Sequence, residues 1–187
     1  GGMKSARNAG FTLIEITAVV IIIGMVASIA IVRLDGMLPS TRTESAAREL
    51  LAQLDFARTQ SIAKAQEYDV VFDFDEQRYA IRIPFDRDGK IVRDREDRDL
   101  LSWHYFQHGT QLLGLIDTRG ELLSEGQYAL TFNPLGTARE IYVYISGITA
   151  NETLDDYELT VRVLALTGIA SVFQGHIEPQ LLVENDF

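Results

Sequence analysis

Glu15 is the residue whose chemistry stands out first, because it is the one charged side chain between Phe11 and Val32. Most of its neighbours in that stretch are Ile, Val, Leu and Ala. An ionised side chain inside such an apolar segment costs roughly 2.5–3.5 kcal/mol even on the lenient membrane-insertion scale. This cost predicts either a cationic partner or a specific function for Glu15.

The segment that must position Glu15 is long enough to cross a bilayer as a helix. Residues 11–32 form a run of 22 residues, and about 20 helical residues span the hydrocarbon core. Lys4 and Arg7 precede this run, and residues 1–10 contain no acid. The positive-inside rule then predicts a single-pass helix with a cytoplasmic N-terminus and the rest of the chain outside the cytoplasm.

Two simpler interpretations compete with this one. The first is an ordinary secretory signal peptide, cleaved after the small-residue stretch Ser28-Ile29-Ala30. The second is a plain membrane anchor. The apolar run exceeds the 7–15 residues usual for the core of a signal peptide, and neither alternative explains Glu15.

Residues 10–15 read GFTLIE, and with the apolar run that follows they resemble the prepilin cleavage and methylation motif. That motif belongs to type IV pilins and type II secretion pseudopilins. The resemblance implies that a prepilin peptidase/methyltransferase cuts between Gly10 and Phe11 and N-methylates Phe11, while the helix stays in place. It also implies that Glu15 of an incoming subunit pairs with the Phe11 amine of a neighbour, a pairing that makes a buried carboxylate tolerable.

Composition limits what the remainder can do. The chain has no cysteine among its 187 residues, which excludes disulfides and thiolate metal sites. Residues 34–187 contain 14 basic and 26 acidic side chains, a net charge of −12. Such an acidic domain argues against a surface that binds nucleic-acid phosphates.

The expected elements form an α+β, pilin-like fold. Gly and Pro interrupt the apolar run near residues 34–39, Thr41 with Glu44 predicts a helix start, and an apolar stripe follows. The stripe comprises Ala47, Leu50, Leu51, Leu54, Ala57, Ile62 and Ala65. Strands are predicted at 68–74 with 78–83, 128–132 with 140–146, and 158–165 with 169–173, and further ones at 103–106 and 112–116.

No β-α-β alternation is present, so we predict a largely antiparallel sheet packed against the N-terminal helix. The expected divisions are a cleaved cytoplasmic leader (1–10), a transmembrane helix (11–33), a helical continuation or stalk (34–66) and a globular antiparallel β-sheet domain (67–187). Residues 54–63, 130–136 and 166–168 resemble corresponding segments of GspH/FimT-type minor pseudopilins. In that family the minor subunits lie at or near the tip of a short periplasmic filament.

Other candidate sites favour structural interpretations. The charged stretch between Asp86 and Asp99 starts like a calcium loop but lacks its later ligands and interleaves basic residues, so we predict a solvated loop. His104 and His108 lie four apart, but residues 103–106 are predicted to form a strand and no H-E-x-x-H motif is present, so a metal pair is not favoured. We predict no catalytic residue, no metal site, no cofactor and no enzymatic activity.

These observations predict a non-enzymatic minor pseudopilin that assembles through its N-terminal helix into a type II secretion pseudopilus, near the tip, and supports protein export. Its expected partners are other pseudopilins, the processing enzyme and the bacterial inner membrane, with the globular domain in the periplasm. The alternative is a minor type IV pilin whose exposed domain binds a ligand such as DNA or a surface. The net charge of residues 34–187 argues against DNA.

Overall fold

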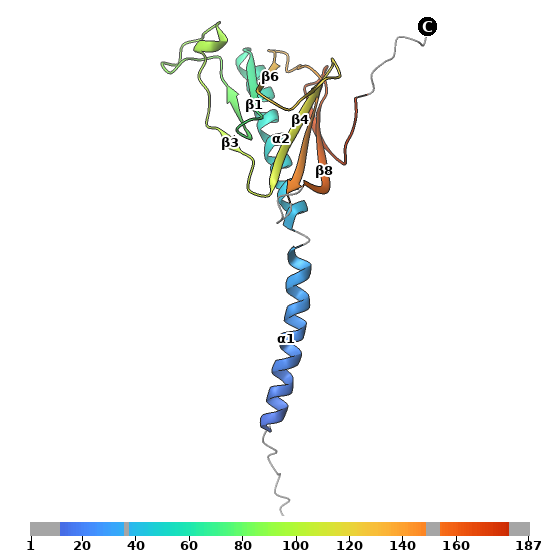
Figure 1. Cartoon of the computed structure of the whole chain (residues 1–187). Helices are drawn as coiled ribbons and strands as arrows, with labels where there is room; N and C mark the ends of the chain where they lie inside the picture. The colour runs from blue at the N-terminus through green and yellow to red at the C-terminus, as the bar shows by residue number, and fades with distance from the viewer. Residues whose placement is uncertain (1–11, 36–37, 149–153, 180–187) are drawn as a thin grey trace, which may run out of the picture. The chain divides into compact units, whose positions relative to one another are not determined.

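The computed structural model describes residues 12–35, 38–148 and 154–179 (Figure 1). The chain divides into two compact units, Gly1–Leu38 and Pro39–Phe187. The first unit contains helix α1, Leu13–Asp35. Among the described residues, no helix combines the length and the apolarity that crossing a membrane requires.

Helix α2, Leu38–Lys64, begins earlier than the capping pattern at Thr41 predicts. That prediction is wrong by one turn, because Pro39 fits the first turn of a helix, where its missing N–H has no helical partner to lose. The predicted stripe is confirmed at Ala47, Leu50, Leu54 and Ala57, which are all fully buried. Helix α2 therefore packs one face into the core.

The end of that stripe differs from the prediction. Ser61 is fully buried and continues the three-four spacing, whereas Ile62 is 46% exposed and Ala65 lies beyond the helix with a positive φ of 51°. The Ser61 hydroxyl donates to the Arg58 carbonyl at 2.7 Å, which satisfies its polar group inside the core. A hydroxyl with a local partner can therefore hold a core position that hydrophobicity alone assigns to a neighbour.

The first sheet has the strand order β3-β2-β1-β6 and is antiparallel throughout. Its strands are β1 (Tyr68–Asp73), β2 (Arg78–Arg82), β3 (His104–Tyr105) and β6 (Gln127–Phe132). The predicted hairpin of β1 and β2 is confirmed, with Asp73 opposite Arg78 at its closed end. Strand β6 lies at one edge of this sheet.

The second sheet has the order β5-β4-β7-β8-β9 and is also antiparallel. Its strands are β4 (Thr110–Asp117), β5 (Leu122–Leu123), β7 (Ile141–Ile148), β8 (Leu154–Val163) and β9 (Ala170–Gln174). The predicted hairpin of β8 and β9 is confirmed. Strand β5 was not predicted, because two residues are too short to show an alternating pattern.

The strands therefore form two sheets where the sequence predicts one. Strands β6 and β7 follow each other in the chain, yet β6 pairs with β1 and β7 pairs with β4 and β8. Buried side chains from α2 and both sheets join in a single hydrophobic cluster, which includes Leu54, Phe72, Leu130 and Val161. The α+β, antiparallel, pilin-like fold is thus confirmed, with one helix packed on two sheets (Figure 1).

Candidate assembly site

Glu15 lies in the first turn of α1 and is exposed. The backbone N–H of Thr12 donates to its Oε2 atom at 3.5 Å, the long limit for a hydrogen bond. The start of a helix favours a carboxylate because the unpaired N–H groups carry partial positive charge. Nothing in this geometry neutralises the full charge of Glu15, so the carboxylate remains available to a cation from outside the described chain.

Thr17, one half-turn away, is different. Its hydroxyl donates to the Leu13 carbonyl at 2.8 Å and is therefore satisfied within the helix. The expected processing residues Gly10 and Phe11 lie outside the described residues.

The apolar side chains described in α1, from Leu13 to Val26, are largely exposed. Every large apolar side chain from Leu13 to Val26 is between 49% and 86% exposed, and these residues surround the helix rather than forming one stripe. A helix that is hydrophobic all round is buried in a core, a helix bundle or a membrane. α1 is therefore a surface that requires an apolar environment supplied by something else.

Buried carboxylates on the strands were missed by the sequence interpretation. Asp69 is fully buried, accepts a hydrogen bond from the Thr131 hydroxyl at 2.7 Å and faces three arginines at 3.7–3.9 Å: Arg82, Arg95 and Arg98. Its Oδ2 atom and Nη1 of Arg98 are buried without a hydrogen bond. The available signal was an aspartate inside the apolar run of β1, a placement that demands a buried partner.

Arg98 also corrects the prediction of a solvated loop between Asp86 and Asp99. Its side chain is only 7% exposed and pairs with Glu67 at 3.5 Å as well as with Asp69. The short helix η1, Arg95–Asp97, lies in the same loop. Residues 87–91 are exposed as expected, but the end of the loop is fastened to the first sheet. The described residues contain no group of three potential metal ligands, here or elsewhere.

Asp73 and Asp117 are two further buried carboxylates with arginine partners, at 3.1 Å from Arg78 and 2.9 Å from Arg119. Burial acts to raise the pKa of both carboxyls. Hydrogen bonds outweigh burial and lower the pKa of each carboxyl. Asp73 accepts them from the Glu76 backbone N–H and the Arg78 and Gln127 side chains, and Asp117 accepts them from the backbone and side chain of Arg119. Both groups are therefore structural anions, held charged by neighbours rather than poised for proton transfer.

Two of the three histidines, His104 and His176, have structural partners. Nδ1 of His104 lies 3.1 Å from Glu49 of α2, and its ring stacks on Tyr79. Nδ1 of His176 lies 2.7 Å from Glu158, and its ring stacks on Tyr144 at 4.0 Å. Burial first, and then the charge of Glu158, raises the pKa of Tyr144 to about 12, so its hydroxyl stays protonated and donates to the Ile177 carbonyl.

The three body segments singled out in the sequence (54–63, 130–136 and 166–168) meet at one place. Asn133 accepts hydrogen bonds from the N–H groups of Leu135 and Thr137, which closes the turn between the two sheets. Arg58 of α2 donates through Nε to the Thr167 carbonyl at 2.6 Å. Gly168, at φ +63°, lies so close to Gly136 that a Cβ atom would overlap the Gly136 carbonyl oxygen. This contact fastens the β8–β9 turn to the inter-sheet turn.

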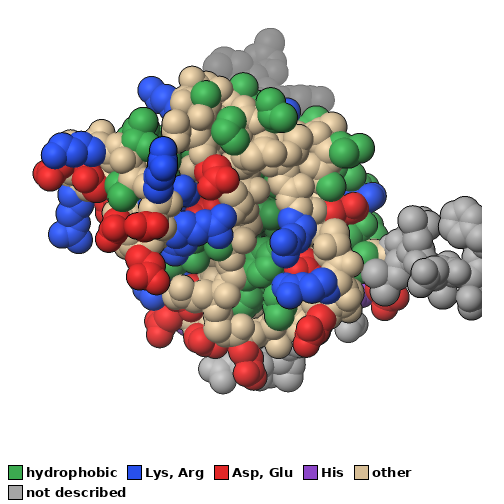
Figure 2. Space-filling model, turned by 90° about the horizontal axis from the view of Figure 1, so that it is seen from above, with side chains coloured by type: hydrophobic (Ala, Val, Ile, Leu, Met, Phe, Trp, Pro, Cys, Tyr) green, Lys and Arg blue, Asp and Glu red, His purple; other side chains and the backbone are tan. Residues whose placement is uncertain are grey.

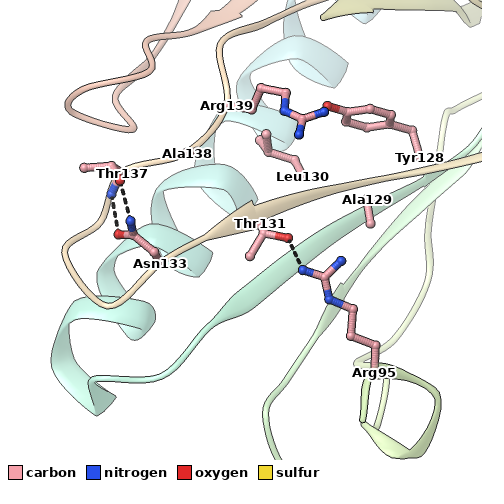
Figure 3. A pocket seen from close by; sticks show the side chains of 9 residues that line it. All are labelled: Arg95, Tyr128, Ala129, Leu130, Thr131, Asn133, Thr137, Ala138 and Arg139. Carbon is pink, nitrogen blue, oxygen red and sulfur yellow. Dashed lines mark hydrogen bonds between the residues drawn. The ribbon is translucent and has the colours of Figure 1, made fainter. Parts of the chain in front are cut away.

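A cleft of about 520 Å³ runs beside β6. Its lining combines β6, the start of the connection to β7 and one arginine of the charged loop: Arg95, Tyr128, Ala129, Leu130, Thr131, Asn133, Thr137, Ala138 and Arg139. Figure 3 shows the Arg139 guanidinium beside the Tyr128 hydroxyl and Arg95 on the other side of the strand, hydrogen-bonded to Thr131 at 3.0 Å. The cleft thus has an arginine on each side.

The family model of the type II transport protein GspH matches residues 46–167. No curated protein matches the chain in sequence.

Two structures of the minor pseudopilin EpsH from the type 2 secretion system of Vibrio cholerae are similar in fold. Both share 15% sequence identity with this chain. The first match covers 71% of this chain and 97% of the EpsH chain, with a TM-score of 0.50. The second covers 74% of this chain and 99% of the EpsH chain, with a TM-score of 0.51. A weaker match is the type IV minor pilin FimU of Pseudomonas aeruginosa, with 17% identity, 75% and 94% coverage and a TM-score of 0.45.

Proposed function

This chain belongs to the GspH family of type II transport proteins, and on that premise we propose that it is a minor pseudopilin. In this role it is a structural, non-enzymatic subunit that assembles with other pseudopilins into a type II secretion pseudopilus, near the tip, and supports export. The family match over residues 46–167 carries the proposal. The exposed apolar side chains of α1 between Leu13 and Val26 support it, because a subunit that joins others through a helix must expose that helix before assembly.

The proposed division follows the chain. Residues 1–10 are a cytoplasmic leader, 11–33 cross the inner membrane, 34–66 continue as a helix, and 67–187 form the periplasmic domain. The apolar side chains of α1 suit both a lipid environment before assembly and a helix bundle afterwards. Glu15 then specifies the register of a subunit by pairing with the amine that processing creates at Phe11 of its neighbour.

Processing has a direct test. We expect the mature chain, purified from cells that contain a prepilin peptidase, to begin at N-methylated Phe11 in intact-mass and peptide mass spectrometry. Gly10→Val should remain uncut, because a branched side chain crowds the scissile bond, whereas Asn8→Gln should be processed normally. A mature chain that begins at Ile31 would identify an ordinary signal peptide and exclude the proposed helix-retaining cleavage.

The alternative function is a minor pilin whose domain binds DNA or a surface. The full chain in detergent should co-purify with other pseudopilins and show no binding to double-stranded DNA at low salt, because its exported residues carry a net charge of −12. Low salt is the most sensitive condition for detecting DNA binding, because electrostatic interactions are screened least there. DNA binding without co-purification of pseudopilins would replace the proposed function by the alternative.

A further inference from the structure

The outer edge of β6 carries unpaired backbone groups, and the hydrogen bonds around it identify them. The Phe74 N–H donates to the Gly126 carbonyl, so residue 126 faces β1. Backbone direction alternates along a strand, so residues 128, 130 and 132 also face β1, while Gln127, Ala129 and Thr131 point outward. Within the described part of the chain, β6 has no strand on that outward side.

The free edge is bounded at one end. Asn133 is the next outward residue, and its N–H already donates to the Thr137 carbonyl at 3.0 Å inside the inter-sheet turn. The unpaired ladder therefore comprises Gln127, Ala129 and Thr131, enough for a short added strand. Such rows of N–H and C=O groups are templates for pairing with another chain.

Space is available beside this ladder. The cleft of about 520 Å³ is lined by Ala129 and Thr131 on the strand side and by residues 137–139 on the opposite side. Its volume falls within the range of about 300–1,000 Å³ typical of binding clefts. Many proteins prevent an edge strand from pairing with another chain by covering it or by placing charged residues or proline on it. Here the outward edge of β6 opens into a cleft.

The charge of the cleft is opposite to that of the domain. Arg139 pairs with Asp117 at 3.5 Å, but Asp117 already binds Arg119, which leaves two cations on one anion. On the other side Arg82, Arg95 and Arg98 share Asp69 and Glu67, so three cations meet two anions. The side chains of Arg95 and Arg139 are about half exposed. Figure 2 shows Lys and Arg side chains on both sides of a hollow in the domain surface.

We infer that the β6 edge binds an extended, acidic segment of a partner protein as an additional strand. Backbone hydrogen bonds to Gln127, Ala129 and Thr131 supply the pairing, and acidic side chains of the segment contact Arg95 on one side and Arg139 on the other. The binding groups lie in the domain and none belongs to α1. Peptide binding and filament assembly are therefore separable by experiment.

The test uses the full chain in detergent and a fluorescent peptide of alternating valine and glutamate, followed by fluorescence anisotropy. Two comparison peptides have lysine in place of glutamate, or N-methyl groups on alternate backbone nitrogens. We expect the acidic peptide to bind, and both comparison peptides to bind at least about tenfold more weakly, because one lacks charge complementarity and the other lacks strand hydrogen bonds.

Protein variants test the same two contributions. The double variant Arg95→Glu with Arg139→Glu should weaken peptide binding about tenfold, whereas Arg87→Glu, on an exposed part of the charged loop, should not. Ala129→Pro removes an outward N–H and should weaken binding about fivefold, while Ala129→Val keeps that N–H and should weaken binding less than the proline does.

Thermal unfolding of each variant shows whether the domain remains folded. We expect Ala129→Pro to fold, because proline is tolerated on an edge strand when its missing N–H faces outward. Equal binding of the acidic and N-methylated peptides would overturn strand addition. Equal binding of the acidic and lysine peptides, or no binding of any peptide by the folded wild-type chain, would overturn the inference as a whole.

Discussion

Glu15→Val is expected to leave the chain inserted in the membrane but to abolish its co-purification with other pseudopilins. Valine makes the segment more apolar, so insertion becomes easier rather than harder. In the proposed filament, however, the variant leaves the Phe11 amine of the neighbouring subunit buried without its carboxylate. Removing one partner of a buried ion pair costs about 3–5 kcal/mol, which corresponds to a loss of association of about a hundredfold or more.

The structure supplies a matched control for this experiment. Thr17→Val also removes a polar group from α1, two residues further on, but that hydroxyl is already satisfied by the Leu13 carbonyl. The Thr17 variant should insert and assemble as the wild type does. Quantitative co-purification after membrane extraction measures both variants. Assembly of Glu15→Val at the wild-type level would show that Glu15 does not determine register.

Gly168→Ala is expected to destabilise the domain by about 3 kcal/mol, the second large effect. An L-residue at the positive φ of Gly168 costs roughly 1–2 kcal/mol, and the new methyl group would overlap the Gly136 carbonyl oxygen. Because that neighbour is backbone, it cannot move aside as a flexible side chain would. The inter-sheet turn and the β8–β9 turn would have to separate, together with the Arg58 bond to Thr167.

Gly175→Ala separates the two contributions. Gly175 has a similar positive φ of 84°, but nothing lies within 4 Å of the position its Cβ would take. It should lose only the conformational part, about 1–2 kcal/mol. Thermal unfolding should show a midpoint lowered by about 10 °C for Gly168→Ala and by about half as much for Gly175→Ala. Equal effects of the two substitutions would mean that the contact with Gly136 contributes nothing.

The sequence predicts those parts of the fold that depend on neighbours along the chain. The β1–β2 and β8–β9 hairpins were predicted correctly because turn residues and alternating side chains lie within a few positions of one another. The distribution of strands over two sheets was not predicted, because the partners of β6 and β7 are chosen by contacts far apart in sequence. Asn133 and Gly136 indicate a turn but do not indicate which sheet the chain enters next.

The candidate site shows the same division. Glu15 was selected from the chemical contrast with its neighbours, which is visible in the sequence alone, and its role in assembly stays a prediction. Arg98 was assigned to solvent because its neighbours in the sequence are charged, yet it is buried against Asp69 and Glu67 from another segment. The outward N–H of Ala129 could not be inferred either, since an edge exists only once all strand partners are known. Processing at Gly10 and Phe11 remains a prediction.

The burial of α2 has a mechanical consequence in the proposed filament. Helix α2 follows α1 in the chain, so tension applied through α1 enters the domain at α2 rather than at a strand. Its buried residues from Ala47 to Ala57 belong to a hydrophobic cluster shared with both sheets, so pulling α2 away would disrupt these contacts. A load on an edge strand would instead open one residue pair at a time. Many weak contacts of α2 with the core would therefore resist such a load collectively.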